Sequence, residues 1–129
     1  MGRPVLGICV GMQLLFEESD EGGGGLGLLR GPVRRLDARR VPHMGWNTLA
    51  VRNGSDVLDG LDGADVYFAH SYAASPADAA VTAAEVDHDG KIVAAVEAGP
   101  VAGVQFHPER SGPAGARVLA NALQWSRSA

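Results

Sequence analysis

The only cysteine of the chain, Cys9, lies between two glycines in the run G-I-C-V-G at residues 7–11. A glycine-flanked nucleophile between a strand and a helix is typical of the nucleophile elbow, here with cysteine in place of serine. Both glycines are expected because so tight a turn brings backbone segments close together. The following helix N-terminus is expected to lower the pKa of the thiol and to offer backbone N–H groups to an oxyanion. A free cysteine also packs well as a small apolar side chain, and this run alone leaves both interpretations open.

A nucleophilic thiol needs a base, and His107 is the best placed of the four histidines. It follows the apolar run V-A-G-V-Q-F, and the C-terminal ends of strands in an open α/β sheet face the functional crevice. Glu109 stands two residues further on, where its carboxylate can orient the imidazole and stabilise its protonated form. Cys9, His107 and Glu109 are therefore predicted to be nucleophile, base and orienting carboxylate. The other histidines are expected within strands or at a solvated hairpin tip: His43, His70 and His88.

The composition is that of a soluble globular protein with a single domain over residues 1–129. The chain is 46% hydrophobic and 20% charged. Its net charge of −4 gives no reason to expect nucleic acid or an anionic membrane as a partner. One cysteine cannot form an internal disulfide, which favours a reducing compartment, the cytoplasm. No apolar run approaches the roughly 20 residues of a membrane-spanning helix. The lone cysteine and scattered histidines predict no metal site, and no other cofactor is expected.

Hydrophobic patterns predict an α/β domain with a mixed sheet. Short apolar and β-branched runs predict strands at residues 4–9, 33–36, 43–51, 65–73, 81–86, 91–96 and 101–106. The dipeptide Asp89-Gly90 predicts a hairpin between two of these strands.

Helices are predicted over residues 12–18, as one turn over 56–61, and from Pro113 toward the C-terminus. The glycine-rich segment 19–25 is predicted to be a mobile loop. One face of the terminal helix is expected to be buried: Val118, Leu119, Ala122, Leu123 and Trp125.

Two further clusters of residues have the composition of ligand-binding segments. Gly22, Gly24 and Gly27 match the glycine pattern of dinucleotide-binding loops, but a predicted helix precedes them where that fingerprint requires a strand. Nucleotide binding is therefore not expected. Four arginines indicate either a solvated edge or a contact surface for an acidic partner: Arg34, Arg35, Arg39 and Arg40.

Taken as a pair, G-I-C-V-G-M-Q at residues 7–13 and G-V-Q-F-H-P-E at 103–109 resemble the motifs of the class I, or triad-type, glutamine amidotransferases. The resemblance implies a flavodoxin-like fold, a mixed sheet with flanking helices. It also implies an activity, in which the cysteine attacks the side-chain amide of glutamine and releases ammonia. A glutamyl thioester forms and is hydrolysed to glutamate. By the same resemblance Gln13 helps to hold the substrate, and the backbone of His70, Ser71 and Tyr72 binds its amino-acid end.

The run P-H-M-G-W-N at residues 42–47, with Y-F-A-H-S-Y at 67–72, is similar to the glutaminase subunits of imidazole glycerol phosphate synthases in histidine biosynthesis. In that family a cyclase subunit, a (β/α)₈ barrel, uses the ammonia to make imidazole glycerol phosphate and an aminoimidazole carboxamide ribotide (AICAR). The resemblance implies a heterodimer and places four residues at its interface: Met44, Trp46, Asn47 and Tyr67. The alternative for Trp46 is an ordinary core position.

The family has a further N-terminal portion before the cysteine strand, so this chain is expected to be the C-terminal portion, truncated at its N-terminus. The additional portion supplies the first strands and a glycine-rich loop of the oxyanion hole. Loss of one oxyanion donor costs on the order of 10²–10³ in rate. Three alternatives stay open. They are the glutaminase of another class I amidotransferase such as anthranilate synthase, an impaired fragment that keeps only the partner-binding face, and an unrelated cysteine hydrolase with the same triad.

Overall fold

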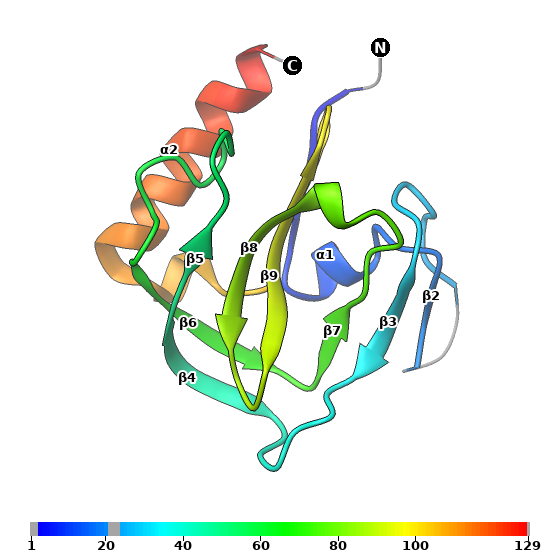
Figure 1. The fold of residues 1–129 in the computed structure, drawn as a ribbon. Coiled ribbons are helices and arrows are strands. Elements are labelled where there is room, and N and C mark those ends of the chain that lie inside the picture. The colour runs from blue at the N-terminus through cyan, green and yellow to red at the C-terminus, as the bar shows by residue number, and fades with distance from the viewer. Residues whose placement is uncertain (1–2, 21–23, 129) are drawn as a thin grey trace.

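The computed structural model describes residues 3–20 and 24–128. Figure 1 shows the arrangement of the elements. The strands are β1 (Val5–Ile8), β2 (Glu18–Ser19), β3 (Pro32–Arg35), β4 (His43–Thr48), β5 (Ala50–Val51), β6 (Asp65–His70), β7 (Tyr72–Ala74), β8 (Thr82–Asp87), β9 (Lys91–Ala98) and β10 (Val101–Val104). The helices are α1 (Val10–Gln13), the 3₁₀ turns η1 (Ala79–Val81) and η2 (Pro108–Arg110), and α2 (Gly112–Ser128).

A five-stranded sheet in the order β1-β10-β9-β8-β5 forms the centre of the described chain. β1 and β10 run parallel, whereas the other neighbouring strands are antiparallel. A three-stranded sheet, β2-β3-β7, and a two-stranded ribbon of β4 and β6 complete the structure. We call the pair of strands β4 and β6 the β4–β6 ribbon. The mixed α/β architecture predicted from the sequence is confirmed.

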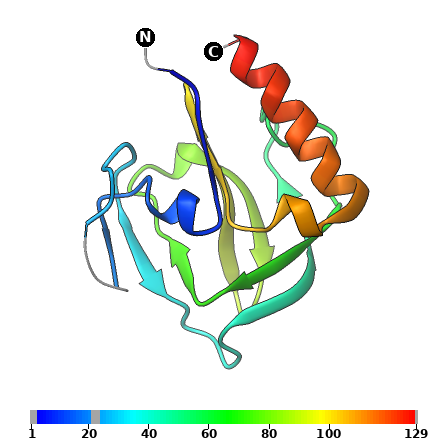
Figure 2. The same cartoon turned by 180° about the vertical axis from the view of Figure 1, so that it is seen from behind.

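Apolar side chains cover the central sheet from two directions. α2 packs against it through Val118, Ala122 and Trp125, in a cluster that includes Val104 of β10. α1 and the segment after it form a second cluster with β3 and β9. Figures 1 and 2 show α1 and α2 on different sides of the central strands. A fully buried Val, Leu, Ile, Phe or Met side chain stabilises a fold by roughly 1.5–3 kcal/mol. Residues of β1 and β10 pack into both clusters, which therefore fix the position of these two strands.

The helix predicted over residues 12–18 is wrong, because α1 ends at Gln13. The buried side chains that suggested it, Met12, Leu15 and Phe16, do enter the core. However, the carbonyls of residues 14–17 accept hydrogen bonds from backbone N–H groups of residues 25–29 instead of continuing a helix. The N–H groups of residues 25–29 occupy the carbonyl acceptors that a longer helix would need, so the helix does not continue.

The segment 19–25, predicted to be a loop, lies partly outside the described residues. Its first residue belongs to β2, which pairs in parallel with β3 through Glu18–Pro32 and Ser19–Val33. The pattern was too short to reveal this strand, since it contributes only two residues.

Two predicted strands are interrupted where they change sheets. The strand predicted over 43–51 divides at Leu49 into β4 and β5, and that over 65–73 divides at Ser71 into β6 and β7. The predicted helical turn over 56–61 is instead a series of turns, from which Val57, Leu58 and Leu61 enter the core. Apolar periodicity therefore located buried segments correctly but did not show where they bend.

The hairpin and the terminal helix are confirmed, with one correction to the helix. β8 and β9 join through a turn in which Asp89 and Gly90 have φ of 57° and 111°. On α2, Leu119 and Leu123 are 44% and 55% exposed, so their predicted burial is wrong. The buried positions follow i, i+3, i+7 and i+10 from Gly115, and the two leucines lie one residue further around the helix.

Candidate active site

Cys9 lies on a strained turn that directly joins β1 to α1. Its φ of 55° falls in the left-handed region that a residue with a side chain rarely adopts. Gly7 is required by the turn, because a Cβ there would lie 2.5 Å from the carbonyl oxygen of Gly11. The prediction that Gly11 must also be small is wrong, since a Cβ there would meet nothing within 4 Å apart from its chain neighbours and its own helix backbone. The elbow thus depends on one glycine.

The parallel pairing of β1 and β10 brings Cys9 and His107 to the same end of the sheet. Ile8 is the register partner of Val104, and the Cys9 N–H donates to the Val104 carbonyl at 2.8 Å. His107 lies three residues beyond Val104, and its N–H donates to the carbonyl of Tyr67 at 2.9 Å. The His107 Nδ1 lies 3.2 Å from a carboxylate oxygen of Glu109, the second residue of the turn η2. The orienting contact predicted for the imidazole is therefore present.

The thiol of Cys9 is half-buried, and this burial dominates its electrostatics. Its pKa is raised above the ordinary value, chiefly by desolvation. The Val10 N–H and the Gln105 side chain act in the opposite direction by donating toward the sulfur, whereas the charge of Glu109 raises the pKa slightly further. The net lowering of the thiol pKa predicted from a helix N-terminus is wrong, because desolvation outweighs the lowering by the Val10 N–H at the start of α1.

Gln13 and Gln105 form a buried pair beneath the thiol. The Nε2 of Gln13 donates to the Oε1 of Gln105 at 3.2 Å and to the Tyr72 carbonyl at 3.3 Å. The Nε2 of Gln105 lies 3.7 Å from the Cys9 sulfur. Gln13 also lines a pocket of about 300 Å³ beside α1, together with Val10, Leu14 and the two residues of β2. The structure thus joins Gln13 and Tyr72, two predicted substrate-binding residues, to the thiol.

His70 and His43 form a second buried pair, side by side across the β4–β6 ribbon. The Nδ1 of His43 lies 2.9 Å from the Nε2 of His70, whose Nδ1 lies 2.8 Å from the Tyr72 carbonyl. Burial lowers the pKa of both imidazoles, that of His43 to about 4. His88 stacks on His43 with ring centroids 4.2 Å apart and contacts the Arg40 carbonyl, so the prediction that it is merely solvated is wrong.

Aromatic side chains cover the outer face of the β4–β6 ribbon. Trp46 is 58% exposed and Met44 63%, which excludes the core alternative for Trp46. The Tyr67 ring lies edge-on to Trp46, with centroids 6.0 Å apart, and under the Arg110 guanidinium at 4.2 Å. We call Met44, Trp46 and Tyr67 the ribbon face.

Asn47 lies on the opposite side of β4 from Trp46, since successive strand residues alternate. Its side-chain amide lies 3.2 Å from the Nε2 of His43 and donates to the Asp87 carbonyl at 2.9 Å. The structure therefore does not bring Asn47 together with the ribbon face. Ser71, the last predicted site residue, lies between β6 and β7, where its carbonyl accepts the N–H of Leu36 at 2.9 Å.

Two polar residues of the site were missed from the sequence. Gln105 is fully buried, and Ser111 is 1% exposed. The Ser111 hydroxyl donates to the His107 carbonyl at 2.6 Å and accepts the Tyr67 N–H at 2.9 Å, which fixes η2 against β6. In the sequence, Gln105 is a lone amide within an apolar strand pattern. A buried amide needs hydrogen-bonded partners, so this pattern could have indicated a polar neighbour such as Gln13. Ser111 left no such signal.

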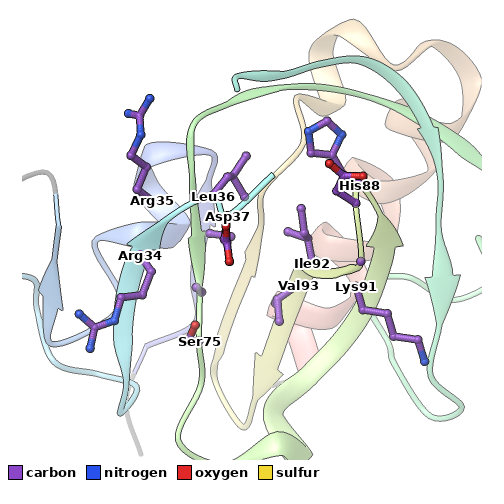
Figure 3. A pocket seen from close by; sticks show the side chains of 13 residues that line it. Arg34, Arg35, Leu36, Asp37, Ser75, His88, Lys91, Ile92 and Val93 are labelled. Atoms are coloured by element: carbon purple, nitrogen blue, oxygen red, sulfur yellow. The ribbon is translucent and has the colours of Figure 1, made fainter. Parts of the chain in front are cut away.

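A separate hollow of about 340 Å³ lies between β3, β7 and the β8–β9 hairpin. Figure 3 shows Arg34, Arg35 and Lys91 extending away from it, so the hollow does not gather positive charge. Beside it, Arg39 forms a close ion pair with Asp89 at 2.8 Å and holds the pKa of that carboxylate well below its usual range.

Within residues 3–20 and 24–128, no three His, Cys, Asp or Glu side chains are grouped so as to hold a metal ion. Over the same described ranges, no helix is long and apolar enough to cross a membrane.

The strained cysteine turn and the histidine–glutamate pair lie at the same end of a mixed sheet, which is the arrangement expected of a triad-type amidotransferase. The sequence matches the family model "Glutamine amidotransferase class-I" over residues 1–125. The chain belongs to the class I glutamine amidotransferases.

Within that family, the chain is similar to curated proteins named imidazole glycerol phosphate synthase subunit HisH. That of Xylella fastidiosa is 52% identical over 126 residues, which are 94% of this chain and 62% of the relative. That of Geobacillus kaustophilus is 48% identical over 129 residues, which are 93% of this chain and 61% of the relative. The chain thus spans about three-fifths of the length of these relatives.

Solved structures support the fold. The crystal structure of a glutamine amidotransferase superposes with a TM-score of 0.71 at 22% identity, covering 96% of this chain and 61% of that one. The glutaminase domain of Trypanosoma brucei CTPS, solved with bound acivicin, gives a TM-score of 0.63 at 19% identity, covering 94% and 60%.

Proposed function

We propose that this chain is part of a glutaminase that hydrolyses glutamine to glutamate and ammonia, with Cys9 as the nucleophile. The observation that carries the proposal is the convergence of the strained Cys9 turn and the His107–Glu109 pair at the same end of two adjacent parallel strands. A nucleophile, a base and a group that orients the base are the parts of a covalent acyl-transfer site.

His107 first accepts the thiol proton, and the thiolate of Cys9 attacks the side-chain amide carbon of glutamine. His107 then returns that proton to the leaving nitrogen, so that ammonia departs and a glutamyl thioester remains on Cys9. Water attacks the thioester while His107 again accepts a proton, and the thiol and glutamate are released. Glu109 holds the imidazole through Nδ1, which leaves Nε2 to exchange the proton. The Val10 N–H, directed at the sulfur side of the turn, is available to the developing oxyanion.

The pocket of about 300 Å³ beside α1 is the proposed binding place of the glutamine. Its volume suits a small ligand, and Gln13 lines it. Gln13 also donates to the Tyr72 carbonyl and so connects the pocket to the segment of His70, Ser71 and Tyr72. This contact supports a role for Gln13 in holding the substrate and for the backbone of that segment in binding its amino-acid end.

The ribbon face is the proposed contact with a (β/α)₈-barrel cyclase subunit, which would use the ammonia in the synthesis of imidazole glycerol phosphate and AICAR. Exposed aromatic side chains and an arginine are enriched at protein interfaces. The backbone of β6 also connects this face to the site, because the Tyr67 carbonyl binds His107 and the Ala69 carbonyl lies 4.0 Å from the Cys9 sulfur. The names of the similar proteins favour this synthase over anthranilate synthase. We expect the heterodimer in the cytoplasm, as a single cysteine suggests.

Glutamate release from glutamine tests the proposal, measured with and without the cyclase subunit. Release that disappears in Cys9→Ala, and rises when the cyclase is added, is the expected result. If no glutamate is released under either condition, the chain is an impaired fragment that only binds the partner. Turnover of esters or peptides without turnover of glutamine would instead indicate an unrelated hydrolase.

A further inference from the structure

Gln105 is a buried amide placed against the nucleophile, and the reaction described above gives it no role. It follows β10 directly, its N–H donates to the Ala94 carbonyl at 2.8 Å, and its side chain is fully buried. An amide in such a position must satisfy both its donor and its acceptor within the protein. Its Oε1 accepts from Gln13, and its Nε2 points to the Cys9 sulfur at 3.7 Å.

The orientation of the Gln105 amide follows from its neighbours. The Tyr72 carbonyl can only accept, so Gln13 must present its NH₂ group to it. That same NH₂ group faces Gln105, which must therefore present its oxygen. The NH₂ group of Gln105 is consequently turned toward Cys9. The chain of contacts Tyr72–Gln13–Gln105 leaves one arrangement of donors and acceptors.

The sulfur changes from donor to acceptor when the thiol ionises. As a thiol, Cys9 lies within donating range of the Ala69 carbonyl, at 4.0 Å. As a thiolate, it can only accept, and donors to an ionised acceptor form stronger hydrogen bonds than donors to a neutral one. Gln105 and the Val10 N–H are the donors on this side. Burial and the negative charge of Glu109 oppose ionisation, and His107 is the proposed acceptor of the proton.

We propose that Gln105 is a further catalytic residue of the glutaminase reaction, which donates its Nε2 hydrogen to the Cys9 sulfur and stabilises the attacking thiolate. The inference rests on the proposed function for its role in turnover, but the hydrogen bond to the thiolate exists whether or not glutamine is the substrate. Gln13 acts through Gln105 as a positioning residue, because it holds the amide in the donating orientation.

The rate of Cys9 alkylation by iodoacetamide, measured against pH, tests the inference directly. Cys9 is the only cysteine, so the reaction of the full chain reports this thiol alone. Gln105→Met keeps the length of the side chain and removes the donor. Because a hydrogen bond to a charged group is lost, alkylation near neutral pH is expected to fall about tenfold and the apparent thiol pKa to rise. Gln13→Met is expected to shift the pKa in the same direction by less.

Ser55→Ala is the matched control for a general loss of stability. Ser55 bonds to Glu97 near the opposite end of the β9–β10 pair and holds the turn that starts at residue 55. Its loss should lower the melting temperature and leave the thiol pKa unchanged. Should Gln105→Met not fold, Gln105→Asn gives the same test, because its shorter side chain withdraws the donor from the sulfur.

A folded Gln105 variant with the parent thiol pKa would overturn the inference, even if it hydrolysed glutamine more slowly. A different result distinguishes the hydrogen bond of Gln105 from the proposed glutaminase function. A thiol pKa that rises in the variant, in a chain that never releases glutamate from glutamine, would support the hydrogen bond and contradict the proposed function.

Discussion

Cys9 combines a conformation that exposes a nucleophile with an environment that keeps it protonated. The turn at φ 55° lifts the side chain out of the sheet, yet half-burial raises the pKa of the thiol. Burial therefore favours the thiol over the thiolate, and in the proposed reaction His107 removes the proton as the sulfur attacks. A site of this kind depends on its base more than a site with a preformed thiolate does.

Replacing the base should consequently cause a large loss of glutaminase activity. His107→Ala is expected to lower kcat on the order of 10²–10⁴-fold, the usual contribution of a general base. Glu109→Gln should lower it by less, because Glu109 acts only by orienting the imidazole and its side chain is 59% exposed. Steady-state kinetics of both variants check this order. An equal or larger loss in Glu109→Gln would contradict the assigned roles.

The buried imidazole of His43 predicts a dependence of stability on pH. Its pKa is about 4 in the folded chain and about 6.5 when unfolded, so the unfolded state binds more protons between these values. The free energy of unfolding should therefore fall as pH is lowered from about 6.5 to 4. Urea unfolding at several pH values would measure the slope, and His43→Gln should reduce it. An unchanged slope in the variant would show that His43 does not contribute.

The β1–α1 elbow is the element on which the site depends, and Gly7 is its critical residue. A Cβ at Gly7 would meet the backbone of Gly11, which cannot move as the end of a flexible side chain could. Gly7→Ala is expected to destabilise the chain by about 1–3 kcal/mol, as overpacking does. Gly11→Ala is the control, since the space around that position is open. Thermal or urea unfolding of both variants would compare them, and an equal cost at the two positions would contradict this account of the turn.

For the helices and strands, the sequence predicted where the buried segments lie better than it predicted where they end or change direction. The G-x-C-x-G pattern located the elbow, because a turn of this kind is encoded within a few residues. The end of α1 at Gln13 was not predictable from local pattern, since the carbonyls of residues 14–17 are taken by N–H groups of residues 25–29. The breaks at Leu49 and Ser71 likewise depend on which sheet each half joins.

The same reasoning applies to the site itself. The Cys9, His107 and Glu109 motifs were evident because their spacing alone implies chemistry. The pairing of Gln105 with Gln13, 92 residues apart, is a property of the folded chain and has no local pattern. The raised pKa of Cys9 also needed the structure, because burial depends on packing from distant segments.

For the molecule as a whole, two surfaces meet at the end of the sheet where Cys9 lies. One holds the site, and the other is the ribbon face on the far side of β6. The β6 backbone contacts both, because the Tyr67 carbonyl accepts from the His107 N–H and the Ala69 carbonyl lies 4.0 Å from the Cys9 sulfur. In the proposed complex, a cyclase seated on Trp46 and Tyr67 would therefore be connected to the proposed glutaminase site through a single strand.

The ribbon face should carry a large part of the affinity for the cyclase. Trp46→Ala is expected to weaken binding about 30-fold, a typical effect of removing a central aromatic residue. The melting temperature of the free chain should change little, because the Trp46 side chain is mostly exposed. Leu119→Ala is the control, because Leu119 is also an exposed apolar residue but lies on α2, away from the ribbon face. Calorimetric titration with the cyclase would compare them, and equal affinities for the two variants would place the interface elsewhere.

Trapping the covalent intermediate tests the central claim most directly. The chain, together with the cyclase, is incubated with glutamine, quenched in acid, digested and analysed by mass spectrometry. The account predicts a glutamyl group on the peptide that contains Cys9 in the parent chain, and none on the corresponding peptide of Cys9→Ala. Glutamate released by the chain without any acyl group on Cys9, or released equally by Cys9→Ala, would contradict it.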